Sequence, residues 1–229
     1  MILFNLKSLG KIEEATFIER PNRFKAICQK GNETVTCHVA DPGRLKEIFI
    51  KGSKVFIIKN KPNLKTDYRL VAVQVGKEKV LINTSIHSKI GEEAIKKGVL
   101  GFTPKKIKRE VKFGNSRIDY LIDDNTFVEL KGSNLLLKEK CLFPDAPTER
   151  GSRHLEELIK AVENGYKSII LFMGIRNCKC FYPYKEMDEK FFKTFFKALE
   201  KNVEFKGFKI KIDDNFNVLL NGTLTLCEE

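Results

Sequence analysis

The stretch RIDYLIDDNTFVELK, residues 117–131, decides the fold of the second half of the chain. Its alternating apolar residues predict two short strands, and the turn signal at 123–125 predicts that they pair as a hairpin. Because side chains alternate between the two faces of a strand, Asp119 leaves the apolar face of the first strand, while Glu129 and Lys131 share one face of the second. Pairing the strands gathers these three side chains into one polar cluster.

Such a cluster has a chemical use. Two close carboxylates repel unless a cation lies between them, and Mg²⁺ is often held by one or two carboxylates, water and phosphate oxygens. The spacing D-x₉-E-x-K resembles the PD-(D/E)xK nuclease superfamily, in which the Asp and the Glu ligate metal and the Lys serves catalysis. The resemblance implies catalytic roles for Asp119, Glu129 and Lys131, with Mg²⁺ or Mn²⁺ held by the two carboxylates. The alternative is an ordinary hairpin whose Glu129 and Lys131 lie on a solvated face.

The net charge of +12 favours a polyanionic partner, and its distribution adds to this. Residues 1–84 carry 16 Lys and Arg against 8 Asp and Glu, whereas residues 85–229 carry 26 against 22. The excess in the first third favours a nucleic-acid surface there, with DNA as the expected partner. The alternative is a lysine-rich surface that reflects composition alone.

Residues 11–80 predict a small β-barrel. Five β-rich segments alternate with turn signals such as Pro21-Asn22 and Asp41-Pro42-Gly43, which is typical of an OB-like fold. Arg44 follows the second of these turns, where its guanidinium could bind a phosphate or, alternatively, pair with Asp41 to brace the loop. The strand pattern stops near Asn83, so we expect an OB-like nucleic-acid-binding domain over 1–84 and a second domain over 85–229.

The second domain should begin with a helix. Apolar residues recur at helical spacing as far as Gly98, with Glu92 and Glu93 beside them. Some nucleases of this fold carry an extra acidic metal ligand on such a helix, and Glu93 is the candidate. Glu110, in the strand before Asp119, competes for that role.

The segment FPDAPTERGSRHLEELIKAV predicts a loop that leads into an amphipathic helix from about Ser152. Arg150, Arg153 and His154 lie near its amino end, where the helix dipole favours anions, so we expect them to contact nucleic-acid phosphates together with Arg117. The alternative is a helix cap with ordinary salt bridges.

The rest of the chain predicts a mixed sheet flanked by helices, because a continuous apolar run, KSIILFMGI, is followed by a Phe-rich helix and three further strands. No apolar run is long enough to span a membrane, and the chain start does not resemble a signal peptide, so we expect a cytoplasmic protein. The close pair Cys178 and Cys180 is interpreted as two thiols on one face of a strand, in preference to a metal or redox site.

Several motifs together resemble the sugar fermentation stimulation protein family: DPGRL, EVKFGNSRIDYLI, VELKG and FPDAPTERGSRHLEEL. The resemblance implies an OB-like domain, a PD-(D/E)xK restriction-endonuclease-like domain and DNA binding. The expected function is therefore a DNA-binding protein with a Mg²⁺-dependent nuclease site that hydrolyses phosphodiester bonds. The alternative is a non-catalytic DNA-binding protein that regulates the expression of sugar-metabolism genes.

Overall fold

The computed structural model describes residues 1–228, which form two compact units. Unit 1 consists of Met1–His87 and Ile210–Leu220, and unit 2 consists of Ser88–Lys209 and Asn221–Glu229. Across residues 1–228, no helix has the length and apolarity needed to cross a lipid bilayer.

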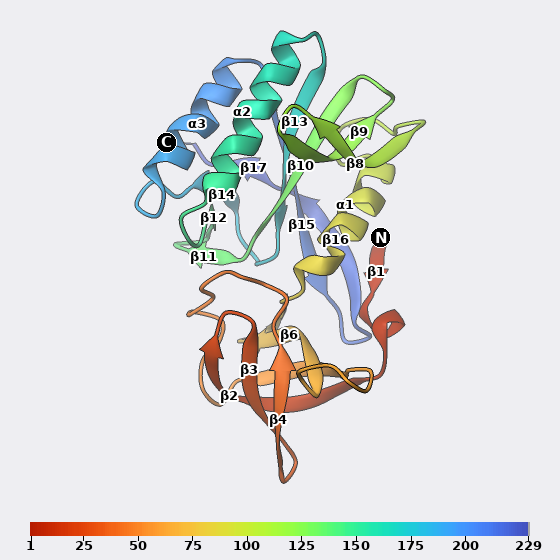
Figure 1. Ribbon diagram of the computed structural model, residues 1–229, viewed down its shortest axis with the longest axis vertical. Coiled ribbons are helices and arrows are strands. Elements are labelled where there is room, and N and C mark those ends of the chain that lie inside the picture. Colours follow the sequence, from red (N-terminus) through yellow and green to blue (C-terminus); the bar gives the residue numbers. More distant parts are fainter. Residues whose placement is uncertain (229) are drawn as a thin grey trace. The chain divides into compact units, whose positions relative to one another are not determined.

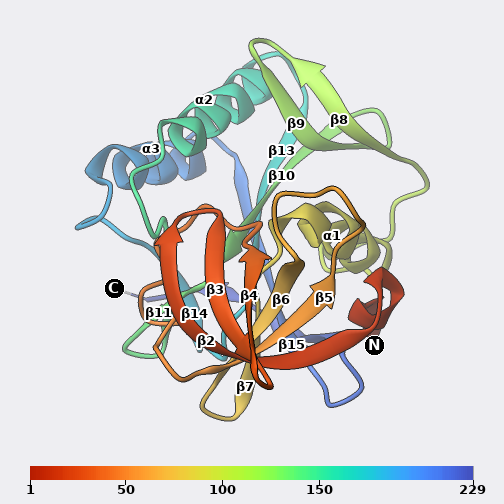
Figure 2. The same ribbon diagram turned by 60° about the horizontal axis from the view of Figure 1, so that its bottom comes forward.

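Unit 1 is built around a closed barrel of five strands, and Figure 2 shows three of them, β2, β3 and β4, side by side. The order β4-β3-β2-β5-β6 closes on itself through a parallel contact between β4 and β6. The expected OB-like barrel is confirmed. Its strands are β2 (Ile12–Asn22), β3 (Lys25–Lys30), β4 (Glu33–His38), β5 (Lys54–Lys59) and β6 (Tyr68–Val75).

Shorter elements complete unit 1. Strand β7 (Glu78–Leu81) extends the sheet beside β6, and β1 (Ile2–Asn5) pairs with β16 (Asn217–Thr223). Two 3₁₀ helices cover Leu6–Leu9 and Thr84–Ile86.

A late segment of the chain also packs on the barrel. Ile212 and Phe216 contact a cluster that includes Phe56 and Ile58, and the rings of Phe56 and Phe216 lie 5.0 Å apart. Unit 1 thus includes residues from near the carboxyl end of the chain. The domain boundary after residue 84 stays a prediction.

Unit 2 contains a mixed sheet in the order β15-β13-β10-β9-β8. Strand β13 is parallel to both of its neighbours, whereas β9 is antiparallel to both β8 and β10. Seven consecutive residues of β13 are buried, as the apolar run predicts for a central strand covered on both faces. The strands are β8 (Ile107–Phe113), β9 (Ser116–Ile122), β10 (Thr126–Ser133), β13 (Lys167–Gly174) and β15 (Glu204–Ile212).

Helices cover both faces of this sheet. Helices α2 (Glu149–Glu163) and α3 (Glu189–Glu200) lie side by side (Figure 1), and their apolar faces form the main core with residues of the sheet. Helix α1 (His87–Lys96) approaches the other face so closely that a Cβ atom on Gly91 would lie 2.6 Å from the Leu130 side chain. The expected mixed sheet flanked by helices is therefore confirmed.

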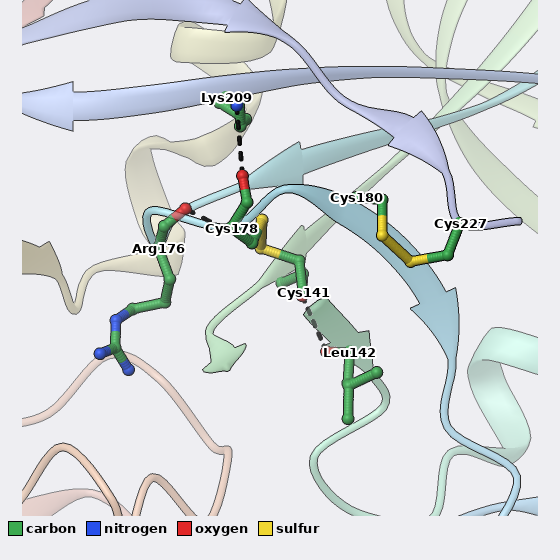
Figure 3. The surroundings of a disulfide bond; sticks show 8 residues. Cys141, Leu142, Arg176, Cys178, Cys180, Lys209 and Cys227 are labelled. Atoms are coloured by element: carbon green, nitrogen blue, oxygen red, sulfur yellow. Dashed lines mark hydrogen bonds between the residues drawn. A yellow bond between two sulfur atoms is a disulfide. The ribbon is translucent and has the colours of Figure 1, made fainter. Parts of the chain in front are cut away.

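A second, four-stranded sheet in unit 2 is held by two disulfide bonds (Figure 3). Its order is β11 (Leu135–Leu137), β12 (Lys140–Phe143), β14 (Cys180–Pro183) and β17 (Thr225–Leu226). The bonds join Cys141 to Cys178 and Cys180 to Cys227. The interpretation of Cys178 and Cys180 as thiols is wrong, because the sheet brings each of them beside a cysteine that is distant in sequence.

Loss of the second bridge should destabilise the protein. The Cys180–Cys227 bond joins residues that are 47 positions apart in sequence. A cross-link over a loop of that size lowers the entropy of the unfolded chain, which raises the free energy of unfolding by about 4 kcal/mol. We expect Cys180→Ser/Cys227→Ser to unfold at a lower urea concentration than the wild type. The control, Cys28→Ala/Cys37→Ala, removes two free cysteines and should cost less. Equal losses in the two double variants would contradict a cross-link effect.

Candidate active site

The site forms where two central strands separate. Strands β9 and β10 pair regularly as far as Tyr120 and Val128, and their ladder then ends. Beyond that point side chains replace the backbone partners: Asp119 Oδ2 accepts a hydrogen bond from the Leu130 amide at 2.7 Å, and Glu129 Oε2 accepts one from the Asp119 amide at 3.4 Å. Both carboxylates are thereby fixed in the gap between the strands.

Glu129 is the most buried member of the cluster, with 1% of its surface exposed. Its Oε1 atom accepts hydrogen bonds from Lys131 Nζ and His154 Nδ1. Burial acts to raise the pKa of the Glu129 carboxyl, but the charge of Lys131 and the hydrogen bond from His154 outweigh it, so that this pKa lies below its ordinary value. Glu129 is therefore held as a carboxylate inside the fold.

Asp119 has the opposite electrostatic character. Burial, and next the charge of Glu129, raise the pKa of Asp119 from 3.8 to about 7, against the opposing influence of Lys131 and the Leu130 amide. Glu110 adds to the repulsion. Asp119 and Glu129 together thus carry more negative charge than Lys131 neutralises. A divalent cation bound between them would reduce this repulsion.

The structure separates the two candidates for an additional acidic ligand. Glu110 lies level with Asp119 on the neighbouring strand β8, where its φ of 51° interrupts the ladder between Arg109 and Val111. Glu93 instead lies on α1 and pairs with Lys96 at 2.8 Å. Of these two candidates, Glu110 is therefore the one whose charge acts on Asp119, and the assignment of a metal ligand stays a prediction for both.

The amino end of α2 supplies a connected pair of side chains. Helix α2 begins at Glu149, earlier than the expected start near Ser152, because Thr148 Oγ1 accepts the Gly151 amide at 3.0 Å and caps it. Arg150 Nε then donates to His154 Nε2 at 3.3 Å. With Nε2 acting as an acceptor, the ring carries its proton on Nδ1 and donates it to Glu129.

His154 therefore lies in a different environment from the expected phosphate contact. His154 is 3% exposed and is hydrogen-bonded to Glu129, so it holds the Glu129 carboxylate in place from inside the fold. This role of His154 was not expected from the sequence. The available signal was the spacing of Arg150 and His154, which places both on one helix face at the end that meets the sheet.

The remaining predicted nucleic-acid contacts are exposed arginines. Arg150 and Arg153 lie on the first turns of α2, and Arg117 lies on β9 two residues before Asp119. In unit 1, Arg44 is exposed in the loop that follows β4. Asp41 Oδ1 accepts the Gly43 amide at 3.0 Å, so this loop is braced by a turn hydrogen bond of its own.

The donor set suits Mg²⁺ better than a metal that requires a complete protein cage. Within the part of the chain that the structure describes, no three His, Cys, Asp or Glu side chains form a ready metal-binding group. Asp119 and Glu129 offer oxygen ligands only, and the pKa of Asp119 is raised by burial and next by the negative charge of Glu129. Mg²⁺ commonly uses one or two carboxylates and completes its shell with water and substrate phosphate oxygens, so the two residues fit it.

Comparison with protein families places both halves of the chain. Residues 18–82 match the model of the SfsA N-terminal OB domain, and residues 85–216 match the sugar fermentation stimulation protein RE domain. The chain belongs to the sugar fermentation stimulation protein family. The match confirms the resemblance seen in the sequence motifs, and it assigns residues 18–82 to a fold class that binds oligonucleotides and oligosaccharides.

Relatives in the sugar fermentation stimulation protein family match over most of their length. A homolog from Sulfolobus acidocaldarius is 45% identical over 86% of this chain and 82% of its own. A homolog from Thermotoga neapolitana is 37% identical over 95% and 96%, respectively. The structure of Pyrococcus furiosus SfsA in complex with Ca²⁺ covers 100% of both chains, with a TM-score of 0.89 and 30% identity.

The raised pKa of Asp119 predicts an unusual pH dependence of stability. Because the pKa is about 7 in the folded chain against 3.8 ordinarily, the folded state keeps a proton that the unfolded state releases. The free energy of unfolding should therefore fall as the pH rises from 3.8 to about 7, and the full loss of stability is present above about pH 7. Asp119→Asn should therefore be more stable than the wild type at about pH 8 in EDTA, by roughly 2–4 kcal/mol, and the difference should vanish near about pH 4.

Thermal unfolding across this pH range measures the difference. Glu156→Gln, which replaces an exposed carboxylate on α2, is the matched control and should show no such window. A stability difference for Asp119→Asn that does not change with pH would mean that Asp119 ionises normally.

Proposed function

We propose that the chain is a metal-dependent nuclease that hydrolyses phosphodiester bonds in DNA. The observation that carries this proposal is the pair of carboxylates, Asp119 and Glu129, fixed between separating strands with Lys131 bonded to one of them. Uncompensated negative charge, an adjacent ammonium group and an excess of basic residues elsewhere in the chain suit a reaction on a phosphate diester.

Asp119 and Glu129 would hold Mg²⁺, and Mn²⁺ could replace it. When bound there, the cation would polarise the scissile phosphate and lower the pKa of a coordinated water molecule. Lys131 is partly accessible, with 14% of its side chain exposed, and would donate hydrogen bonds to the attacking water or to a phosphate oxygen that gains charge.

The residues around this pair would fix its geometry. Arg150 holds the ring of His154, and His154 holds Oε1 of Glu129, so that the carboxylate cannot rotate freely. Arg117 and Arg153 are exposed and would contact phosphates that flank the cleaved bond. Binding energy from such remote contacts positions the substrate for attack.

The relative from Pyrococcus furiosus supports a cation site of this kind. Its structure was determined in complex with Ca²⁺, which, like Mg²⁺, prefers oxygen ligands. Ca²⁺ accepts more ligands at longer distances than Mg²⁺, so a site with few protein ligands and open positions could take either ion.

A second candidate function is DNA binding without cleavage, as in a regulator of sugar-metabolism genes. The observation that favours it is that Glu129 Oε1 is already engaged by Lys131 and His154, and that among residues 1–228 no third metal-binding side chain completes the group. The same carboxylates would then be structural, replacing the missing ladder bonds of β9 and β10.

A cleavage assay separates the two functions. Labelled single-stranded, duplex and branched DNA, and RNA, would be incubated with Mg²⁺, Mn²⁺ or EDTA. We expect metal-dependent products from the wild type, and rates lower by at least about 100-fold in Asp119→Asn and Lys131→Ala, because each removes a group that acts in the transition state. Glu156→Gln on α2 and Lys197→Ala on α3 remove exposed charges of the same kinds and should keep the wild-type rate.

Two outcomes would contradict the nuclease. Cleavage that survives in Asp119→Asn would place the activity elsewhere. Absence of products with every nucleic acid and metal, while salt-sensitive DNA binding persists, would favour the non-catalytic function.

A further inference from the structure

Unit 1 contains a cationic pocket that the carboxylate site does not use. It has a volume of about 490 Å³ and lies between β2, the turn after β2, and the loop that joins β4 to β5. Its charged lining residues are Glu19, Arg20, Arg23, Arg44, Lys46 and Lys51. Five of them are cationic and one is acidic, so a ligand of this pocket should be an anion.

The walls of the pocket are held in place by one side chain. The guanidinium of Arg20 donates to the carbonyl oxygens of Gly43 at 2.9 Å, Arg44 at 2.8 Å and Asp41 at 2.8 Å in the loop, and to that of Arg23 at 2.7 Å in the turn. Arg20 thus ties the two opposite walls together. Since both walls are fixed before a ligand arrives, binding loses little conformational entropy.

The loop also presents its cations outward. Leu45 is fully buried and has a φ of 51°, a conformation that a leucine adopts only where its surroundings enforce it. Its neighbours Arg44 and Lys46 are exposed, as are Arg23 and Lys51. A buried anchor between two exposed cations fixes the charged rim relative to the barrel.

The base of the pocket is apolar and partly aromatic. Phe49 is half-buried, its ring lies 5.0 Å from that of Phe17, and the Arg20 guanidinium lies 5.0 Å from its centroid. A ligand that combines a flat ring with a phosphate therefore matches this pocket, because the ring can lie on the aromatic base and the phosphate can contact the cationic rim. The volume is in the range of roughly 300–1,000 Å³ that small-molecule pockets occupy, which suits one nucleotide and is too small for a duplex.

We propose that this pocket binds one unpaired nucleotide of a single-stranded nucleic acid. The base would lie against Phe49 and Ile18, and the phosphates on either side would be bound by Arg44 and Lys51. The proposal deepens the proposed function and rests on its nucleic-acid binding, but it does not require cleavage. A neutral oligosaccharide, the other common ligand class of OB folds, would leave the cationic rim without partners.

Binding of labelled oligothymidylate, followed by fluorescence anisotropy in EDTA, tests the phosphate contacts. We expect Arg44→Gln/Lys51→Gln to weaken binding by at least about tenfold and to reduce the slope of log affinity against log salt by about 1.4, since each phosphate contact on a single strand contributes about 0.7. The matched control, Lys61→Gln/Lys77→Gln, removes two exposed cations of unit 1 outside the pocket and should have the smaller effect. Equal effects would overturn the pocket in favour of a diffuse basic surface.

An abasic oligomer of the same length and charge tests the base contact. The wild type should bind it about 5- to 160-fold more weakly than oligothymidylate, because stacking on aromatic side chains contributes about 1–3 kcal/mol per base. In Phe49→Leu, which stays apolar, this preference should largely disappear. Equal binding of both oligomers by the wild type would overturn the base-binding role. Thermal unfolding of each variant shows whether it is folded.

Competitors define the ligand class. Single-stranded DNA should displace the labelled oligomer at lower concentration than duplex DNA of the same length, and a neutral oligosaccharide of glucose should not displace it. Displacement of the labelled oligomer by the oligosaccharide, or tighter binding of duplex DNA, would overturn the proposal. Tighter binding of a free mononucleotide than of the single strand would also overturn it. Because every measurement is made without metal, failure of the nuclease proposal leaves these results unchanged, and failure here leaves the cleavage assay unchanged.

Discussion

The carboxylate site depends on the hydrogen bond between Asp119 Oδ2 and the amide of Leu130. Two neighbouring strands that part inside a sheet leave amide groups without backbone partners, and such groups are costly when buried. Here carboxylate oxygens take over that bonding, so the same two side chains complete the sheet and form the proposed metal site. The arrangement concentrates negative charge in a place where water cannot solvate it fully, which raises the pKa of Asp119, whereas Lys131 and His154, which are bonded to Glu129, lower the pKa of that carboxyl.

The surrounding fold makes that concentration of charge tolerable. Helix α2 brings His154 against Glu129, and a Thr148 cap fixes where the helix begins. The parallel pairing of β10 with β13 continues past Glu129 and Lys131, so the strand that carries them remains anchored on that side. Elsewhere in unit 2, two disulfide bonds constrain a small sheet whose last strand, β17, has only two residues. Short strands make few backbone bonds, and covalent links compensate for them.

The two proposed sites have opposite electrostatic character. The carboxylate pair of unit 2 attracts cations, whereas the cationic pocket of unit 1 attracts anions. In each site the side chains are fixed by hydrogen bonds inside the same unit. A phosphate diester bears the negative charge that the pocket suits and is also the group on which a cation held by carboxylates acts. Membership of the sugar fermentation stimulation protein family accounts for the OB barrel and the RE domain, and the chemistry has to be argued from the individual residues.

The sequence by itself determined the barrel, the mixed sheet and the gathering of Asp119, Glu129 and Lys131, because strand periodicity and turn residues are local properties of the chain. Tertiary structure decided the rest. The disulfide partners of Cys178 and Cys180, the burial of His154 behind Glu129, and the packing of Phe216 on the barrel all join residues far apart in sequence. Such contacts depend on how strands and helices are ordered in space, and no local pattern specifies that order. The role of Arg20 illustrates the reason, since three of its four carbonyl partners lie in a loop that is 21 to 24 residues away in the sequence.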